Sequence, residues 1–221
     1  MKKIIAFALV LACLFVLVSC GGNEVDDVAA MYENSNPTKI VITTSQKFSS
    51  HELKGEYTLI TGYSNGKNAA LYVEVYDRMR NVEEGATDVI VDVIETVSNK
   101  YEYLEDKGVR TNGGSWVADQ ESFVQNVGAI ALNLSSKLVN KHKYEDNKLS
   151  CVVPAKNTAE VLGLEANLSV DATLEILDDG ASVNLVSITY TIPANEASGV
   201  EETVVTINAV YTYNLEQITI D

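Results

Sequence analysis

The sequence has few of the residues that most metal and catalytic sites need. Its 221 residues include three cysteines and two histidines. Three cysteines cannot form a disulfide framework, and two histidines make a catalytic triad or a transition-metal site hard to assemble. Basic residues are also scarce, with 16 Lys and Arg against 31 Asp and Glu and a net charge of -15. Such a chain repels nucleic acid phosphates and has no polybasic face for anionic lipids, so we expect no nucleic acid partner.

Sequence motifs of catalysis are missing as well. The chain contains no Gly-x-Ser-x-Gly, no Ser-x-x-Lys and no glycine loop of the kind that cradles phosphate. His51 and His142 lie far apart in polar stretches, and Cys151 lies in an apolar stretch that predicts a buried, inert thiol. Acidic pairs such as Asp178 and Asp179 lie at turns and helix starts, which predicts solvated carboxylates without the spacing of a calcium loop. We expect no enzyme, no catalytic residue, no metal and no dissociable cofactor.

The N-terminus has the pattern of an export signal. A short basic start, residues 1–3, precedes an unbroken apolar run over residues 4–18. A helix that spans a membrane permanently needs about 20 apolar residues, so this run is short for that purpose. The residues at its end are Leu17, Val18, Ser19 and Cys20.

These four residues resemble the bacterial lipobox, with a branched apolar residue three positions before the cysteine and a small residue directly before it. The resemblance implies recognition of Leu17, Val18 and Ser19 by a signal peptidase, and a diacylglycerol thioether on Cys20. An acyl chain such as palmitate is often added to the new N-terminal amine in this family. The only cofactor expected is this covalent lipid, which would hold the protein on the outside of the bacterial cell membrane. An ordinary signal peptide with an incidental Cys20 is the alternative.

The lipobox divides the chain into three parts. Residues 1–19 are the expected signal peptide, residues 20–23 the acylated cysteine and a short tether, and residues 24–221 a single globular domain. Cleavage removes two lysines and no acid, so the net charge of the mature chain becomes -17.

The domain is predicted to be α+β and mainly antiparallel β. A short helix is expected over 24–32, and the Asn65-Gly66 pair between alternating apolar runs predicts a β-hairpin. Strands are expected over residues 39–48, 56–63, 69–76, 87–98, 100–104, 109–111, 148–153, 168–177, 182–192 and 202–213. We therefore expect a curved sheet or half-barrel of about 9–11 strands, with a sandwich as the alternative.

One long and a few short helices are predicted to cover this sheet. Apolar residues at helical spacing predict an amphipathic helix of about 20 residues from Asp119 to about Asn140. We expect the apolar stripe of this helix to pack into the core. A short helix is expected over 158–164. The apolar stripe of the long helix includes Phe123, Val127, Ile130 and Leu134.

Tyrosine is the most informative residue type in the domain. Ten of the eleven tyrosines lie in predicted strands or at their margins, in pairs that share a face, such as Tyr101 and Tyr103. Cross-strand packing on a half-exposed surface explains such pairs, and a wall that faces a ligand is the other interpretation. The candidate ligand-binding residues are Tyr57, Tyr72, Tyr101, Tyr211, Phe123, Val127, Ile130 and Leu134.

Two stretches, VAAMYENSNPTK at 28–39 and LKGEYTLITG at 53–62, resemble the leading helix and first strands of the LolA-like and LppX/LprG-like lipid-carrier lipoproteins. The element order is similar over most of residues 24–221. The resemblance implies a membrane-anchored, non-enzymatic binding or carrier module for an acyl chain or another amphiphile. The alternative is an envelope scaffold or protein-interaction lipoprotein with a packed core and no ligand. The expected partners are the membrane and a hydrophobic or lipid ligand, and the sequence identifies no protein partner.

Overall fold

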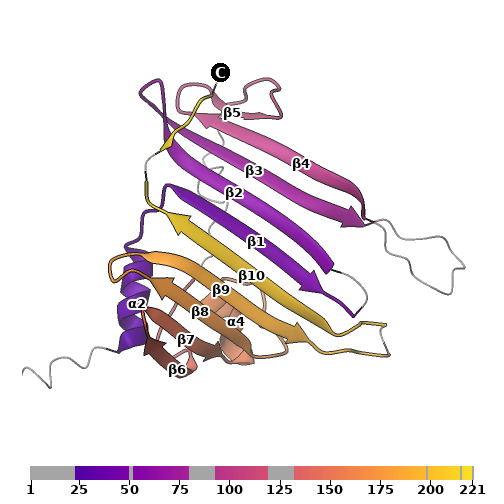
Figure 1. Ribbon diagram of the computed structural model, residues 1–221. Coiled ribbons are helices and arrows are strands. Elements are labelled where there is room, and N and C mark those ends of the chain that lie inside the picture. The colour runs from indigo at the N-terminus through magenta and orange to yellow at the C-terminus, as the bar shows by residue number, and fades with distance from the viewer. Residues whose placement is uncertain are drawn as a thin grey trace, which may run out of the picture.

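The computed structural model describes residues 23–49, 52–79, 93–118, 132–197, 199–214 and 216–220, and its strands form one large antiparallel sheet (Figure 1). The predicted signal peptide and lipobox, including Leu17 and Cys20, lie outside these residues. The helices are α2 (Glu24–Glu33), the 3-10 helix η1 (Ala155–Asn157) and α4 (Thr158–Leu162). The strands are β1 (Lys39–Lys47), β2 (Glu52–Ser64), β3 (Lys67–Met79), β4 (Val93–Leu104), β5 (Gly108–Thr111), β6 (Asn140–Glu145), β7 (Lys148–Val153), β8 (Ala172–Asp178), β9 (Val183–Ile192), β10 (Thr203–Thr212) and β11 (Glu216–Gln217).

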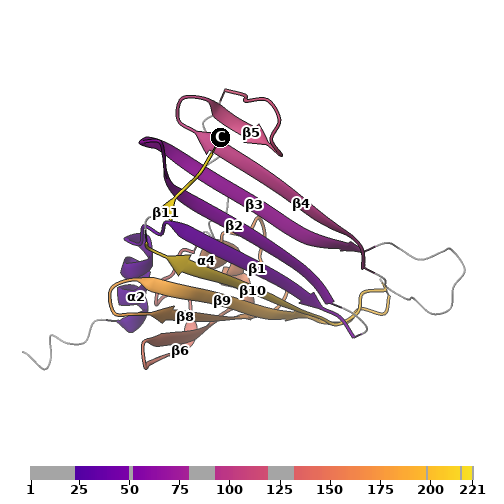
Figure 2. The same ribbon diagram turned by 45° about the horizontal axis from the view of Figure 1, so that its top comes forward.

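Two antiparallel meanders meet at the centre of this sheet. The strand order is β5-β4-β3-β2-β1-β10-β9-β8-β7-β6, so the chain runs outward from β1 to β5 and returns from β6 to β10 beside its starting point. β1 and β10 pair over the whole length of β1, from Lys39 opposite Thr212 to Lys47 opposite Val204. The sheet has eleven strands and stays open, with β5 and β6 as its edges (Figures 1 and 2). The predicted strand number and antiparallel pairing are confirmed.

The hairpin predicted at Asn65-Gly66 is confirmed. It joins β2 to β3, and Ser64 lies opposite Lys67, so the loop has two residues. Asn65 has a φ of 52° and Gly66 a φ of 78°. Both values lie in the left-handed region that a type I′ turn requires, and Asn and Gly adopt it with the least strain.

The main hydrophobic core lies under the half of the sheet formed by β6–β10. Leu149, Leu174 and Ile176 from β7 and β8 are fully buried there, together with Val25 of α2 and Val161 of α4. Figure 1 shows both helices at this end of the sheet. Asn23 caps α2 by accepting a hydrogen bond from the Val25 amide at 3.2 Å, and acidic residues occupy the first turn, where the helix dipole favours them.

A second, smaller core lies on the opposite face of the other half. β11 pairs in parallel with β2, and Ile218 and Ile220 after it pack on Ala69 and Leu104, with Trp116 beside them. The yellow C-terminal segment crosses this corner of the sheet in Figure 2. The C-terminal stretch therefore does not extend β10. It crosses to β2 and covers the apolar residues of β3 and β4 on this face.

The long helix predicted up to Asn140 is wrong over its last part. Residues 132–139 form coil and a turn, and the helices within the described ranges are all short. Leu132 and Leu134 are both buried while Asn133 between them is exposed and donates its amide to the Val161 carbonyl at 2.9 Å. This is the two-residue period of extended chain, and Leu134 and Leu138 happen to fit both periods. Phe123, Val127 and Ile130 lie outside the described residues.

Two strand predictions also need correction. The stretches 87–98 and 100–104 were expected as separate strands, but β4 runs without interruption from Val93 to Leu104, and residues 87–92 lie outside the described part. β6 was not predicted at all. Its sequence, NKHKYE, is mostly exposed, so it lacks the apolar alternation that identifies a strand.

Candidate functional site

The register of the sheet assigns every strand residue to one of two faces. Residues directly opposite each other in an antiparallel pair project to the same side. We call the side that carries α2 and α4 the helix face. One cross-strand row on it runs from the core outward, through Tyr211, Ile40, Leu59, Tyr72 and Tyr101. The predicted tyrosines Tyr57, Tyr72, Tyr101 and Tyr211 therefore all lie on this face.

Five of the helix-face tyrosines gather on β2, β3 and β4, away from the described helices. We call this group the tyrosine patch; its members are Tyr57, Tyr72, Tyr76, Tyr101 and Tyr103. All five are partly buried. The rings of Tyr72 and Tyr101 lie opposite each other, with centroids 5.6 Å apart and planes tilted by 37°. This is the distance at which paired aromatic rings attract each other.

A carboxylate lies at the centre of the tyrosine patch. Glu74 of β3 is opposite Tyr57 on one side and Asn99 on the other. Its Oε1 accepts hydrogen bonds from Asn99 Nδ2 at 2.8 Å and from the Tyr101 hydroxyl at 3.2 Å. Burial and the negative charge of Glu74 raise the pKa of Tyr72 to about 12. The patch is therefore a neutral aromatic surface around one negative charge.

Glycine makes room for one ring of the patch. Gly55 precedes Tyr57 on the same face of β2, and a Cβ at position 55 would lie 3.3 Å from the Tyr57 ring and 2.8 Å from the Thr44 hydroxyl. The Tyr57 ring thus folds back over the glycine, where any side chain would collide with it or with Thr44. The absence of a side chain at Gly55 therefore allows the Tyr57 ring to lie over the backbone at position 55.

Two hollows lie at the two ends of the patch. The Tyr63 hollow, of about 260 Å³, is lined by Thr61, Tyr63, Asn68, Ala70 and Tyr103 together with the loop 36–38. The Leu53 hollow, of about 210 Å³, is lined by Thr44, Gln46, Leu53, Gly55, Tyr57 and Tyr76, with Lys54 and Asp77 at its margin. Both share residues with the patch, so the helix face of β1–β4 is hollowed on either side of Glu74.

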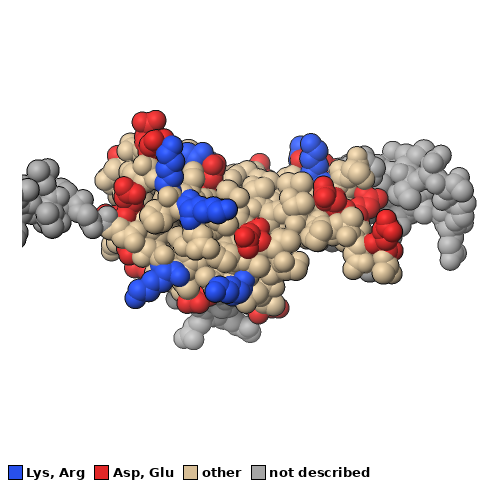
Figure 3. Space-filling model, turned by 90° about the horizontal axis from the view of Figure 1, so that it is seen from below, with Lys and Arg blue, Asp and Glu red and all other residues tan. Residues whose placement is uncertain are grey.

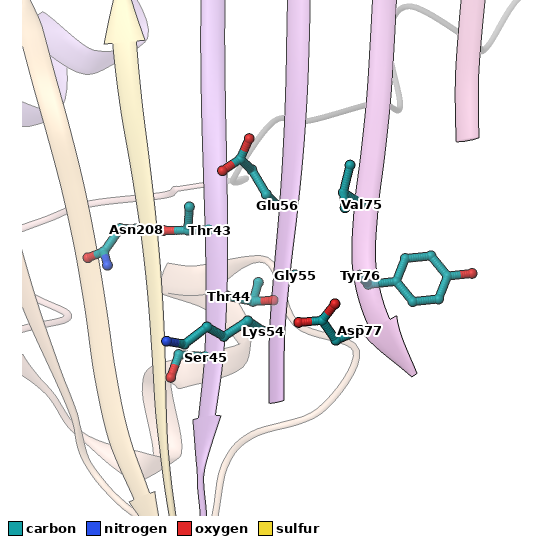
Figure 4. A pocket seen from close by; sticks show the side chains of 10 residues that line it. All are labelled: Thr43, Thr44, Ser45, Lys54, Gly55, Glu56, Val75, Tyr76, Asp77 and Asn208. Atoms are coloured by element: carbon teal, nitrogen blue, oxygen red, sulfur yellow. The ribbon is translucent and has the colours of Figure 1, made fainter. Parts of the chain in front are cut away.

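A larger groove, of about 300 Å³, lies on the opposite face of the same strands. Figure 4 shows the side chains that line it, which come from β10, β1, β2 and β3. They are mainly polar and include Asn208, Thr43, Ser45, Lys54, Glu56 and Asp77. Lys54 forms an exposed ion pair with Glu52 at 3.0 Å, and the Ser45 hydroxyl donates to Glu52 at 2.6 Å. Exposed pairs of this kind contribute little energy, so this ion pair adds little to the stability of the groove.

Two of the predicted ligand-binding residues lie in the core. Tyr211 is 7% exposed, and its ring meets the Tyr32 ring of α2 edge to face, with centroids 6.0 Å apart. Leu134 is 5% exposed and belongs to the same core. Neither residue borders the hollows described above. Phe123, Val127 and Ile130, which were also predicted to bind the ligand, fall outside the described residues, as does the predicted lipidation site Cys20.

Two of the described reactive side chains, Cys151 and Asp178, are buried. Cys151 is 2% exposed, as predicted, and burial raises the pKa of its thiol to about 12, so it stays protonated at neutral pH. Asp178, predicted to be solvated, is buried instead and accepts hydrogen bonds from the Tyr144 hydroxyl and the Gly180 amide. His142 is exposed, and His51 lies outside the described part. Within that part, no group of three or more His, Cys, Asp and Glu side chains could hold a metal ion.

Glu74 and Asn99 were not predicted as part of the site. The signal was present, because Glu74 alternates with Tyr72 and Tyr76 along β3 and so shares their face. Asn99 could not be found in this way. Its position opposite Glu74 depends on the pairing of β3 with β4, and residues 80–92 separate the two strands in the sequence.

The surface seen from below carries both signs of charge. In Figure 3, Lys and Arg side chains lie among Asp and Glu side chains, without a continuous basic area on this face. None of the described helices is long and apolar enough to cross a membrane.

Comparisons with known proteins identify no family for this chain. No family model matches the chain, and it matches neither a curated protein nor a solved structure.

Proposed function

We propose that this protein is a membrane-anchored extracytoplasmic lipoprotein that binds or carries an amphiphile on the helix face of its sheet. The tyrosine patch with its two flanking hollows is the observation that carries the proposal. An amphiphile needs a surface with apolar and polar parts, and tyrosine offers a ring and a hydroxyl group together. The row through Ile40 and Leu59 connects the patch to the apolar core, and Leu59 is itself buried, so the two flanking hollows are the places for an alkyl chain.

The membrane anchor of the proposal is the covalent lipid on Cys20. α2 begins at Glu24, so only residues 21–23 separate the acylated cysteine from the folded domain. Three residues reach about 10–14 Å when fully extended. The domain would therefore sit close to the bilayer, within reach of amphiphiles that leave it. Because the lipid attaches the protein, the acidic net charge does not need to attract the membrane.

Native mass spectrometry tests the binding function. The mature chain, residues 20–221, is made without its signal peptide in a bacterial host and transferred gently into the gas phase. We expect a retained amphiphile of several hundred daltons. If only the mass of the protein is seen, and added alkyl amphiphiles neither bind nor raise the melting temperature, the proposal is wrong. A ligand at 100 times its Kd should stabilise the fold by about 2.7 kcal/mol, a shift of about 5–10 °C.

Matched variants connect binding to the tyrosine patch. Tyr72→Ala removes one ring of the central pair, and we expect it to weaken retention of the amphiphile. Val73→Ala is the control, because Val73 is the next residue of β3, is also partly buried and projects to the opposite face. Equal losses in both variants would place the ligand elsewhere.

An envelope scaffold with a packed core is the second candidate function. The core of the β6–β10 half favours it, because nine large side chains of the described residues there are exposed by less than 2%. Such packing leaves no room for a ligand between α2 and the sheet. The scaffold would show no retained amphiphile and no change of melting temperature in the experiment above.

A further inference from the structure

The charge on the tyrosine patch favours a ligand of one sign of charge. Among the described side chains on the helix face of β1–β5, Glu74 is the one charged group; the lysines and the arginine of these strands whose side chains are described project to the opposite face. None of the ion pairs between described residues includes Glu74. The negative charge on this face is thus held by neutral donors and is not neutralised by them.

The geometry of Glu74 leaves it able to accept a ligand. Its carboxylate accepts hydrogen bonds from Asn99 and Tyr101, both on Oε1, and from the Tyr72 hydroxyl. A carboxylate has about four lone-pair sites, so these three neutral donors leave room for a further donor or a cation. Partial burial lowers the local dielectric constant and strengthens the attraction for a positive charge compared with a carboxylate in water. An anionic head group at the same position would be repelled.

The rings around Glu74 add to this preference. Tyr72 lies two residues before Glu74 and Tyr76 two residues after it on the same face, and Tyr57 lies directly opposite it. The faces of aromatic rings attract ammonium groups through their quadrupole, most strongly when the site is partly desolvated. A carboxylate among several tyrosines is therefore suited to an ammonium head group.

We infer that the amphiphile bound by the tyrosine patch carries a cationic head group, a primary or quaternary ammonium, which lies at the Glu74 carboxylate among the surrounding tyrosines. This inference rests on the proposed function, because the patch must first bind an amphiphile. The alkyl chain then extends from Glu74 into one of the two flanking hollows. No covalent step is involved.

Three detergents with one chain length test the inference: dodecyltrimethylammonium, dodecyl maltoside and dodecyl sulfate. Each is titrated below its micelle concentration into the mature chain, residues 20–221, by calorimetry at physiological salt. We expect the cationic probe to bind about 2- to 30-fold more tightly than the maltoside, and the sulfate most weakly. Equal or tighter binding of the maltoside, or the tightest binding of the sulfate, overturns the inference and leaves amphiphile binding standing. If no probe binds, the proposed function fails and the inference fails with it.

Two variants separate Glu74 from the general acidity of the chain. We expect Glu74→Gln to abolish the preference for the cationic probe over dodecyl maltoside. Glu56→Gln removes the same charge from an exposed position on the opposite face, opposite Val75, and should keep the preference. Equal effects of the two substitutions would mean that net charge alone attracts the cation, against the inference. Circular dichroism checks the fold of each variant, and the comparison of the three probes on the unmodified chain does not depend on either.

Discussion

At the scale of single residues, a buried carboxylate is the clearest example of a charge retained inside this fold. Glu102 of β4 is 3% exposed and pairs with Arg110 of β5 at 2.5 Å and with Lys100 at 2.8 Å. The Arg110 guanidinium also lies 4.8 Å from the centre of the Trp116 ring. Burial alone would raise the pKa of Glu102, but the hydrogen bonds from Arg110 and Lys100 outweigh it and hold the pKa below its usual value.

Replacement of Arg110 should therefore be costly. We expect Arg110→Leu to lower the free energy of unfolding at neutral pH by about 3 kcal/mol, because it leaves a carboxylate buried without its closest partner. Urea denaturation measures the loss. The double variant with Glu102→Leu removes both charges and should be more stable than Arg110→Leu alone; a double variant that is less stable would contradict the assignment.

The same ion pair gives a pH dependence with a definite sign. The pKa of Glu102 is lower in the folded chain than its unfolded value of 4.5, so its contribution is complete above that value and is lost as the pH falls through the folded pKa. The difference in stability between the unmodified chain and Arg110→Leu should be constant near neutral pH and narrow in acid. A difference that widens below pH 4.5 would contradict this explanation.

At the scale of elements, the β2–β3 hairpin depends on its two turn residues. We expect Gly66→Ala to destabilise the protein by about 1 kcal/mol, because alanine at a positive φ brings its Cβ close to the backbone. For a chain of this size the melting temperature should fall by about 2–4 °C. Asn65→Gly is the control, since glycine adopts the same conformation freely and should change the melting temperature little. An unchanged melting temperature in Gly66→Ala would argue against the type I′ turn.

The elements that could be predicted from the sequence are those with local signals. The β2–β3 hairpin has Asn-Gly at its turn, and β7 to β10 alternate apolar and polar residues between turns. The stretch from Leu132 to Val139 could not be assigned in this way, because its leucines fit a helix and an extended chain equally well. Its contacts decided the outcome: the amide of Asn133 binds Val161, and Ser136 binds Asp26 of α2. Both partners are distant in the sequence.

At the scale of the whole molecule, the proposed lipid anchor would determine where the protein works. We expect Cys20→Ala to abolish incorporation of labelled fatty acid and to leave an unprocessed precursor, because only a thiol can form the thioether that precedes cleavage. Metabolic labelling and detergent phase separation measure both effects. Cys13→Ala, within the apolar run of the same signal, is the matched control and should change neither. An unchanged detergent-phase fraction in Cys20→Ala would contradict the lipoprotein assignment.

The arrangement of the two meanders brings the candidate site together. β3 and β4 supply Tyr72, Glu74, Asn99 and Tyr101, and they reach the same face only because β4 pairs with β3 in one particular register. A shift by one residue would turn Asn99 and Tyr101 to the opposite face. The junction of β1 with β10 then connects this half of the sheet to the core under α2.

By itself, the sequence determined the strand-rich class, the two-residue turn at Asn65-Gly66, the buried thiol of Cys151 and the scarcity of groups for metal or catalytic chemistry. These properties depend on composition, on local backbone preference or on a period of two along one strand. The tertiary structure decided that Tyr211 belongs to the core, that residues 132–139 are not helical, and that Glu74 meets Asn99 among the tyrosines. Each of these depends on which strand or helix lies beside the residue. Such partners are distant in the chain, so no local pattern contains them.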